Sequence, residues 1–476
     1  MIDDKDMSPL FVDLDGTLIY TDLLLEVSLK FLKQNPLNIF LLIGWLTKGK
    51  ANLKHKLAER VEINAATLPY NHDFLVFLKE QRERGRKLFL ATASHQNHAD
   101  AIAEHLGIFN GVLATSATFN MKGENKLKHC LEVSPTFAYA GNETFDFVLF
   151  DKADEAFLVN PTASALRLSK KRPVTRIFER KINKLKIALK AMRVHQWLKN
   201  TLIFVPVFVS SLYLEPAVWG NAMIGFLLFS LLASATYLLN DLLDIDADRA
   251  HPRKCSRPIA SGMLTIREAI SLATGLIIIT LIGAIFFTNT AFQLSILAYL
   301  ILTLLYTFVL KSYVIADVIS LASLFTIRII AGAMVINVVL SFWLLAFSMF
   351  TFFSLALVKR CAELKLLSKV NKDKATGRDY QVDDYYLMQS FGVTSAFISL
   401  LLMAFYVQVS MEGQDYSMPI LLWATLPAFA YWFLRMWLKT NRGEMHDDPI
   451  VFSMKNKGSF VTIGFILVIT LLAKLL

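Results

Sequence analysis

Four side chains that suit a hard metal ion recur at intervals of about one helical turn between residues 240 and 248. Within the stretch NDLLDIDADRAHPRKCSRPIASG (240–262), they are Asn240, Asp241, Asp244 and Asp248. On a helix this spacing gathers side chains on one face. Clustered carboxylates repel one another unless a cation lies between them, and oxygen ligands at a phosphate site favour Mg²⁺. The stretch therefore predicts a magnesium site, and Asp246 falls off its face.

A basic run follows these acidic residues. Lys254 and Arg257 offer direct partners for phosphate oxygens, because charged donors form strong hydrogen bonds with them. His251 precedes Pro252 and is interpreted as structural, with a substrate contact as the alternative. The alternative is a polar loop beside the membrane, but such a loop rarely combines periodic acids with a basic run bracketed by prolines. The two runs together predict a site for a phosphorylated substrate.

A second acidic pair, Asp13 and Asp15, lies in FVDLDGTL (11–18), where an apolar strand leads into a glycine turn. Short apolar runs, PLFVDLDG, RKLFLATAS, GVLATS and TFAYAGN, alternate with helical stretches over residues 1–165. This alternation predicts an α/β domain with a parallel sheet. Residues 37–46 are apolar but too few to span a bilayer, so we expect a buried cap helix. An interfacial helix is the alternative.

The composition predicts a membrane protein. The chain has 476 residues, of which 55% are hydrophobic, and a formal net charge of +10; its mean hydropathy is +0.46. The basic residues lie mostly in loops beside apolar segments. A membrane surface and phosphorylated substrates are therefore expected as partners, and nucleic acid is not. The three cysteines have no paired spacing, which indicates neither a disulfide framework nor a zinc site.

Nine apolar segments follow residue 200. They are 200–214, 217–239, 265–287, 290–310, 314–335, 341–358, 390–410, 417–437 and 458–475. The loops 240–264, 311–313, 359–389 and 438–457 carry the Lys and Arg residues, whereas the short loops near 215, 288, 338 and 413 have none. The positive-inside rule then places the amino end and the 240–262 stretch in the cytoplasm, and the carboxyl end outside. The amino end lacks the pattern of a secretory signal, and we expect a prokaryotic inner membrane.

A basic segment, 166–199, connects the two parts. Ile177, Phe178, Leu185, Leu189 and Met192 recur there at roughly helical spacing. Such a helix can lie on an anionic bilayer surface. A solvated linker helix is an equal alternative. The expected domains are thus 1–165, the linker 166–199 and the membrane domain 200–476.

The pattern N-D-x-x-D-x-x-x-D followed by RPIASG resembles the UbiA superfamily of intramembrane prenyltransferases, over about 190–476. Members typically have nine transmembrane helices, so the resemblance implies an all-α membrane domain. The stretches RVHQWLKN (193–200), HPRKCSRPIASG (251–262), YTFVLKSYVIADVISLASLFTIRIIAGA (306–333) and ALVKRCAEL (356–364) are most similar to the decaprenyl-phosphate phosphoribosyltransferase branch. That resemblance implies transfer of phosphoribose from 5-phosphoribosyl diphosphate to a polyprenyl phosphate.

The same resemblance implies further site residues. Asp317 is expected to bind substrate, and the expected phosphate-binding residues are Lys199, Lys311, Arg328 and Lys359. Lys311 could equally be a topology anchor, and a structural ion pair is the alternative for Arg328, which interrupts an apolar stretch. One feature separates the chain from typical prenyltransferases of the superfamily. Their second D-x-x-x-D pair is absent, since Leu321 stands four residues after Asp317.

FVDLDGTL, FLATAS (89–94), GENK and GNETFD resemble, in this order, the motifs of haloacid dehalogenase-like phosphatases, over about 8–165. The resemblance implies a Rossmann-like domain in which Asp13 attacks phosphorus and Asp15 acts as general acid and base. Thr92 and Lys126 would hold phosphoryl oxygens, with Ser94 as an alternative to Thr92. Magnesium would be held by the following residues: Asp13, Asp15, Asn142 and Asp146. Asn142 replaces the usual aspartate of the last motif and removes one charge from that site.

The two resemblances together imply a bifunctional enzyme with one Mg²⁺ in each domain. The membrane domain would make a lipid-linked 5-phosphoribose, and the soluble domain would remove its 5-phosphate. One rival is a prenyltransferase acting on an aromatic acceptor. Another is a non-catalytic transporter or scaffold for polyprenyl phosphate, against which the intact acidic motifs argue.

Overall fold

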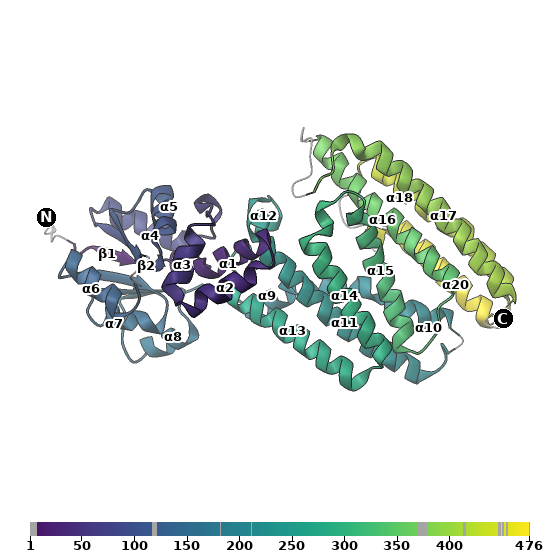
Figure 1. The fold of residues 1–476 in the computed structure, drawn as a ribbon, viewed down its shortest axis with the longest axis horizontal. Coiled ribbons are helices and arrows are strands. Elements are labelled where there is room, and N and C mark those ends of the chain that lie inside the picture. Colours follow the sequence, from purple (N-terminus) through teal and green to yellow (C-terminus); the bar gives the residue numbers. More distant parts are fainter. Residues whose placement is uncertain are drawn as a thin grey trace. The chain divides into compact units, whose positions relative to one another are not determined.

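The computed structural model describes residues 7–475 apart from 117–120, 181, 211, 370–377, 413–415, 446–448, 450–451 and 454–455. The chain forms two compact units (Figure 1). The first comprises residues 1–192 and 237–272, and the second comprises 193–236 and 273–476. Position 413 and parts of the predicted loops 359–389 and 438–457 lie outside the described residues. The first unit thus combines the α/β part with the 240–262 stretch.

A six-stranded parallel sheet is the framework of the first unit. Its strand order is β3-β2-β1-β4-β5-β6. The strands are β1 (Leu10–Val12), β2 (Leu88–His95), β3 (Gly111–Thr115), β4 (Ala138–Gly141), β5 (Glu155–Val159) and β6 (Arg176–Phe178). The predicted parallel sheet is confirmed, and its order is that of a doubly wound fold.

Helices cover both faces of this sheet. Alternate residues of β1 explain why: Leu10 and Val12 pack in one apolar core, and Phe11 packs in the other. The first core includes residues of α4 (His72–Glu83) and α5 (Gln96–Leu106). The second includes residues of α6 (Glu124–Val133), α7 (Phe147–Phe150) and α8 (Ala163–Ser169). Figure 1 shows α4 and α5 on one side of the strands and α7 and α8 on the other.

Strands β5 and β6 were not anticipated. Ile177 and Phe178, which the spacing predicted in a basic helix, lie in β6 at the edge of the sheet. That prediction is wrong because Phe178 packs edge-on and tilted against the rings of Phe74 and Phe77 in the core. The helical parts of this segment are the end of α8 (Ala163–Ser169), then α9 (Lys184–Ala191) and the 3₁₀ helix η3 (Val194–Phe204).

Three helices are inserted between β1 and α4: α1 (Leu23–Gln34), α2 (Asn38–Thr47) and α3 (Lys50–Ala58). The prediction that residues 37–46 form a buried cap helix is right about the helix and wrong about its burial. Phe40 is 71% exposed and Ile43 is 55% exposed, and Leu42 is the buried residue of α2. A helix that is apolar all round offers more apolar surface than one contact face can cover. The exposure agrees with the interfacial alternative.

Eight helices in the described ranges are long and apolar enough to cross a membrane. They are α11 (Pro216–Leu243), α13 (Ile266–Phe287), α14 (Thr290–Phe308), α15 (Ala316–Val335), α16 (Phe342–Lys369), α17 (Tyr385–Glu412), α18 (Thr425–Asn441, with η7, Pro419–Ala424, before it) and α20 (Lys457–Leu475). The protein is therefore a multi-pass membrane protein.

The first of the nine predicted spans, 200–214, differs from expectation. It consists of the end of η3 and a short helix, α10 (Val205–Val209), which contains Pro206. Neither is long enough to cross a bilayer. The segment packs instead on α15, where Gly332 lies against the backbone of Ile203 and a side chain at that position would collide with it.

Candidate active sites

The first candidate site lies where the strand order of the sheet reverses. The chain continues to opposite sides from β1 and β4, which are neighbours, and ligands of doubly wound sheets bind at this point. Asp13 directly follows β1 and Asn142 directly follows β4. The Asp13 N–H donates to the carbonyl oxygen of Ala140 at 2.9 Å, which ties the two strand ends together. The sheet therefore brings together two predicted residues that are far apart in sequence.

A buried lysine joins the carboxylates of this site. The Lys126 Nζ donates to Asp13 Oδ1 at 2.7 Å and to the Tyr139 hydroxyl at 3.0 Å. That hydroxyl donates to Asp146 Oδ1 at 3.1 Å. Burial, with Asp13 adding to it, raises the pKa of Asp146 to about 6. Burial alone would lower the pKa of Lys126, but Asp13 and Asp146 raise it overall, so the site holds a fixed cation beside Asp13.

Tyr139 was missed by sequence reasoning. It is fully buried in β4 and connects the two predicted residues Lys126 and Asp146. A buried tyrosine usually finds a partner for its hydroxyl. The tyrosine inside the apolar run TFAYAGN, two residues before the glycine turn, was the available signal.

Asp15 is held by the protein at both carboxylate oxygens. Its Oδ1 accepts from the Leu23 N–H and its Oδ2 accepts from the Ser94 hydroxyl, both at 2.9 Å. Burial, together with nearby Asp22, raises the pKa of Asp15 to about 7. Thr92 is fully buried, and its hydroxyl oxygen accepts from the Ser94 N–H at 3.0 Å. Ser94, the predicted alternative, is thus the hydroxyl that contacts Asp15.

Asn142 has an oxygen that fits a bound cation. Its Oδ1 is buried and has no hydrogen-bond partner among the described residues, which is rare for a buried polar atom. Asp146 is engaged differently, because its Oδ2 accepts from the N–H groups of Asn142 and Glu143 at 2.9 Å. Gly16, with a positive φ of 75°, leaves the space that the Asn142 side chain fills. The oxygen atoms of Asp13 and Asn142 therefore suit Mg²⁺, which prefers oxygen ligands.

The second candidate site is formed by the 240–262 stretch of the same unit. The Arg257 Nη1 lies 3.1 Å from Asp241 Oδ1 and 2.6 Å from Asp248 Oδ2, and both carboxylates are buried. Two carboxylates thus converge on the position of one cationic atom. Burial raises the pKa of Asp248, and the Arg257 guanidinium opposes that shift. This pair suits Mg²⁺, which typically takes one or two carboxylates together with substrate phosphates.

The remaining predicted residues of this stretch are placed differently. Asp244 stands between the end of α11 and α12 (Ile245–Ala250), and its Oδ1 is 2.9 Å from the Lys33 Nζ. Asn240 is half-buried, and Lys254 is exposed in a short 3₁₀ turn. Across the described ranges, no three His, Cys, Asp or Glu side chains are grouped to hold a metal ion. The expected single face is therefore shared by Asp241 and Asp248.

In the second unit, Asp317 has a cationic partner that the sequence did not reveal. Arg360 donates to both of its carboxylate oxygens, at 2.5 and 3.0 Å, and the Tyr306 hydroxyl donates to Oδ1 at 2.9 Å. Asp317 and Arg360 are both buried. The available signal was Arg360 itself, a charged residue in an apolar helix, since such a residue needs a partner. The expected contact of Asp317 with substrate stays a prediction.

Arg328 is buried without an acidic partner. Its Nε donates to Asn200 Oδ1 at 2.9 Å. Its guanidinium lies over aromatic rings, with the ring centre of Phe325 at 5.1 Å, and no described carboxylate forms an ion pair with it. The buried Lys199 Nζ lies 5.7 Å from the same ring. Two predicted cations therefore meet at one aromatic side chain, whereas Lys311 and Lys359 are half-buried on other elements.

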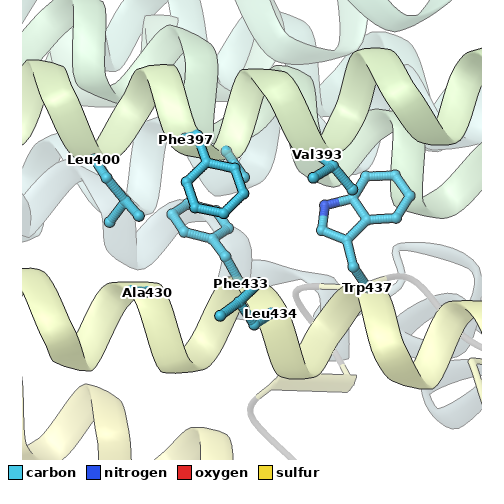
Figure 2. A pocket seen from close by; sticks show the side chains of 8 residues that line it. Val393, Phe397, Leu400, Ala430, Phe433, Leu434 and Trp437 are labelled. Atoms are coloured by element: carbon cyan, nitrogen blue, oxygen red, sulfur yellow. The ribbon is translucent and has the colours of Figure 1, made fainter.

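An apolar hollow between α17 and α18 contains none of the predicted residues (Figure 2). It is lined by Val393, Ala396, Phe397, Leu400, Ala430, Phe433, Leu434 and Trp437. These side chains offer no acid, base or metal ligand. The hollow therefore plays no part in the candidate sites described above.

The chain belongs to the UbiA prenyltransferase family. Residues 203–461, more than half of the chain, match this family. The predicted UbiA-like helical membrane domain is thereby confirmed. The match includes the acidic stretch, Arg257 and Arg328, but it stops short of the α/β sheet.

Individual relatives add detail. Protein y4nM of Sinorhizobium fredii is 36% identical over 457 residues, covering 95% of this chain and 88% of its own length. A decaprenyl-phosphate phosphoribosyltransferase of Mycolicibacterium smegmatis is 37% identical over 186 residues, which are 38% of this chain and 58% of that protein. A solved structure of a UbiA homolog from Archaeoglobus fulgidus, bound to GPP and Mg²⁺, is 16% identical and covers 60% of this chain and 99% of its own, with a TM-score of 0.48.

Proposed function

We propose that the membrane part transfers 5-phosphoribose from phosphoribosyl diphosphate to a polyprenyl phosphate. The observation that carries this proposal is Arg328, a buried cation that forms no ion pair with any described carboxylate and contacts the same ring, Phe325, as Lys199. Such a cation suits a phosphate group. The likeness to decaprenyl-phosphate phosphoribosyltransferases over 186 residues supports it. The absent second D-x-x-x-D pair argues against transfer of a prenyl chain to an aromatic acceptor.

The predicted site residues between Lys199 and Lys359 then have the following roles in this reaction. Asp241 and Asp248, together with Asn240 and Asp244, would hold Mg²⁺, which stabilises the negative charge on a leaving diphosphate. Lys254 and Arg257 would bind phosphate oxygens. Lys199, Lys311, Arg328 and Lys359 would bind the remaining phosphate groups, and Asp317 the substrate. The polyprenyl phosphate is already an anionic nucleophile, so the reaction needs no general base.

We further propose that the α/β domain is a haloacid dehalogenase-like phosphatase that removes the 5-phosphate from this product. Asp13, held at the strand end beside Lys126, would attack phosphorus, and Asp15 would protonate the leaving oxygen and then activate water. Lys126 and Thr92 would hold the phosphoryl oxygens. Asp13, Asp15, Asn142 and Asp146 form the proposed ligand set of the second Mg²⁺, and the partnerless oxygen of Asn142 supports this assignment.

We place both sites on the cytoplasmic side of a prokaryotic inner membrane. The support is the Lys and Arg content of the loops on that side. A phosphorylated ribose head could then reach the soluble domain without crossing the bilayer. Labelling of single cysteines introduced in the loop near 338 tests this orientation, because that loop should be accessible from outside; labelling only after permeabilisation would reverse it.

The decisive experiment incubates the purified full chain with phosphoribosyl diphosphate and several polyprenyl phosphates, followed by mass spectrometry of the lipids. Polyprenylphosphoryl ribose without the 5-phosphate is the expected product. A parallel incubation with a polyprenyl diphosphate and an aromatic acid tests the rival prenyl transfer. A prenylated aromatic product, with no lipid-linked ribose, would overturn the proposal.

A further inference from the structure

We infer that the α/β domain positions the acidic stretch of the proposed transferase, through a buried ion pair between Glu26 of α1 and Arg249 of α12. Both residues belong to the first compact unit. The inference rests on the proposed transfer reaction and adds a role for the α/β domain that is independent of its phosphatase site. Arg249 and Glu26 are positioning residues, since neither belongs to the proposed ligand sets.

Arg249 and Glu26 form a buried, bidentate ion pair, called the clamp below. The Arg249 Nη1 and Nη2 donate to the two Glu26 oxygens at 2.6 and 3.1 Å, and the side chains are only 4% and 6% exposed. Glu26 is fixed in turn, because its Oε2 accepts from the buried Thr21 hydroxyl at 2.9 Å. Two parallel hydrogen bonds of this kind define orientation as well as distance. A buried pair with satisfied partners is also little screened by salt.

Arg249 is one residue from the site that it would position. Asp248, its neighbour, carries one of the two carboxylates that converge on Arg257. The Arg249 Nε also donates to the carbonyl oxygen of Ala260 at 3.0 Å, within the RPIASG segment that contains Arg257. The guanidinium therefore connects the acidic run to the basic run. Because α12 has only six residues, its own hydrogen bonds cannot hold this arrangement.

Further contacts between the amino-terminal part and residues 244–262 agree with this positioning role. Lys33 of α1 lies 2.9 Å from the proposed metal ligand Asp244, and Lys30 lies 3.1 Å from Asp246. At the end of RPIASG, Gly262 has a positive φ of 67° and lies directly against Tyr20, so no larger residue fits there. The first turn of α1 also contacts the proposed phosphatase site, because the Leu23 N–H donates a hydrogen bond to Asp15. One helix thus contacts both proposed sites.

The test compares the full-length wild type with Glu26→Gln, Arg249→Gln and the double variant, all in lipid nanodiscs. Lys184→Gln is the matched control, because Lys184 and Glu268 also connect the amino-terminal part to the stretch beyond 240, at 2.6 Å, but lie exposed. Hydrogen–deuterium exchange of peptides covering 245–262 reports the positioning directly. Initial rates with phosphoribosyl diphosphate and polyprenyl phosphate report its consequence.

We expect faster exchange in 245–262 and a kcat at least tenfold lower in the three variants, with the KM for polyprenyl phosphate within about twofold. The double variant, which leaves no unpaired buried charge, should lose no more rate than either single variant, since the residues act as one unit. Hydrolysis of soluble ribose 5-phosphate should stay within about twofold. Lys184→Gln should resemble the wild type in every measurement.

The outcomes separate this inference from the proposed function. If the wild type forms no lipid-linked phosphoribose, the proposed function fails, and exchange in 245–262 alone decides whether the clamp holds the stretch. Unchanged exchange in Glu26→Gln and in the double variant would overturn the inference. A wild-type rate in variants with faster exchange would overturn it as well.

Discussion

The two candidate sites of the first unit place their carboxylates by different means. In the sheet site, Asp13 and Asn142 stand at the ends of neighbouring strands, and the register of β1 with β4 fixes their separation. In the helical site, Asp241 lies on the last turn of α11 and Asp248 lies on the short helix α12, with a break at Asp244 between them. The sheet register therefore fixes the first pair, whereas the two carboxylates of the helical stretch lie on separate helices, which Glu26 and Lys33 contact from α1.

The basic residues of the two sites, Lys126 and Arg257, also differ in how firmly they are held. Lys126 is buried beside Asp13 and is held by a second contact with Tyr139. Arg257 is about a quarter exposed and forms ion pairs with two carboxylates of its own stretch, Asp241 and Asp248. A substrate phosphate could replace Asp241 and Asp248 as the partner of Arg257 once a metal ion binds those carboxylates. The comparison predicts a rigid sheet site and an adaptable helical site.

Asp13→Asn should give the largest effect. An amide at this position cannot readily form an aspartyl-phosphate, so phosphatase activity should fall by roughly 10³-fold or more. The helical site has separate ligands and should continue to turn over. Mass spectrometry should therefore detect accumulation of the 5-phosphorylated lipid. Identical lipid products from wild type and variant would show that the two sites do not act in sequence.

Asp241→Ala tests the helical site. Removal of one carboxylate that converges on Arg257 should reduce formation of lipid-linked phosphoribose on the order of 10²–10³-fold, as for other fixed electrostatic groups at a reacting centre. Hydrolysis of a soluble phosphate ester should persist. Asp244→Ala should also lose transfer, and the radiolabelled transfer assay can rank the two variants. Near-normal transfer in both would contradict the metal assignment.

The sheet site was the more predictable from sequence. Its motifs follow apolar strand-like runs, and parallel strands deliver the residues that follow them to one edge. The resemblance to phosphatase motifs predicted Asp13, Lys126, Asn142 and Asp146 together; Lys126 contacts Asp13, and the Asn142 N–H donates to Asp146. The partner Tyr139 was missed because a tyrosine in an apolar strand is read first as core. Strand β6 was missed for a related reason, since Ile177 and Phe178 fit a helical spacing as well as an edge strand.

The helical site was predicted less fully because periodicity assumes an unbroken helix. Asp241 and Asp248 are seven residues apart, close to two full turns, and they do share a face. Asp244 takes a non-helical ψ of 15° as the residue before α12, which turns its side chain toward Lys33. Contacts such as Glu26 with Arg249 join residues more than 220 positions apart. No local pattern of residues specifies a contact of that kind.

Two buried arginines of the second unit, Arg328 and Arg360, are expected to have different roles, one in substrate binding and the other in stability. Arg328 has no acidic partner in the described chain, so Arg328→Gln should raise the KM for a phosphorylated substrate by roughly 10- to 100-fold, the value of a charged hydrogen bond. Arg360→Gln should instead lower the free energy of unfolding by about 3–5 kcal/mol, because it leaves Asp317 buried and unpaired. Thermal unfolding in detergent and steady-state kinetics separate the two. Equal changes in both properties for both variants would remove the distinction.

The smallest expected effect concerns α2, which belongs to the same unit as the carboxyl end of α11 and the amino end of α13. Phe40 and Ile43 expose large apolar surfaces there, and insertion into the lipid interface would bring the sheet site toward its lipid-linked substrate. Full burial of such side chains is worth about 1.5–3 kcal/mol each, and partial burial less. The double variant Phe40→Ser/Ile43→Ser should therefore slow hydrolysis of the lipid-linked phosphate about three- to tenfold. Its rate of hydrolysis of soluble ribose 5-phosphate should not change. Val76→Ser, on α4, replaces a side chain that is also 57% exposed and serves as the control. Rates measured in vesicles should differ between the two variants, because α2 has no charged residue whereas α4 has several. Equal losses would exclude a membrane contact of α2.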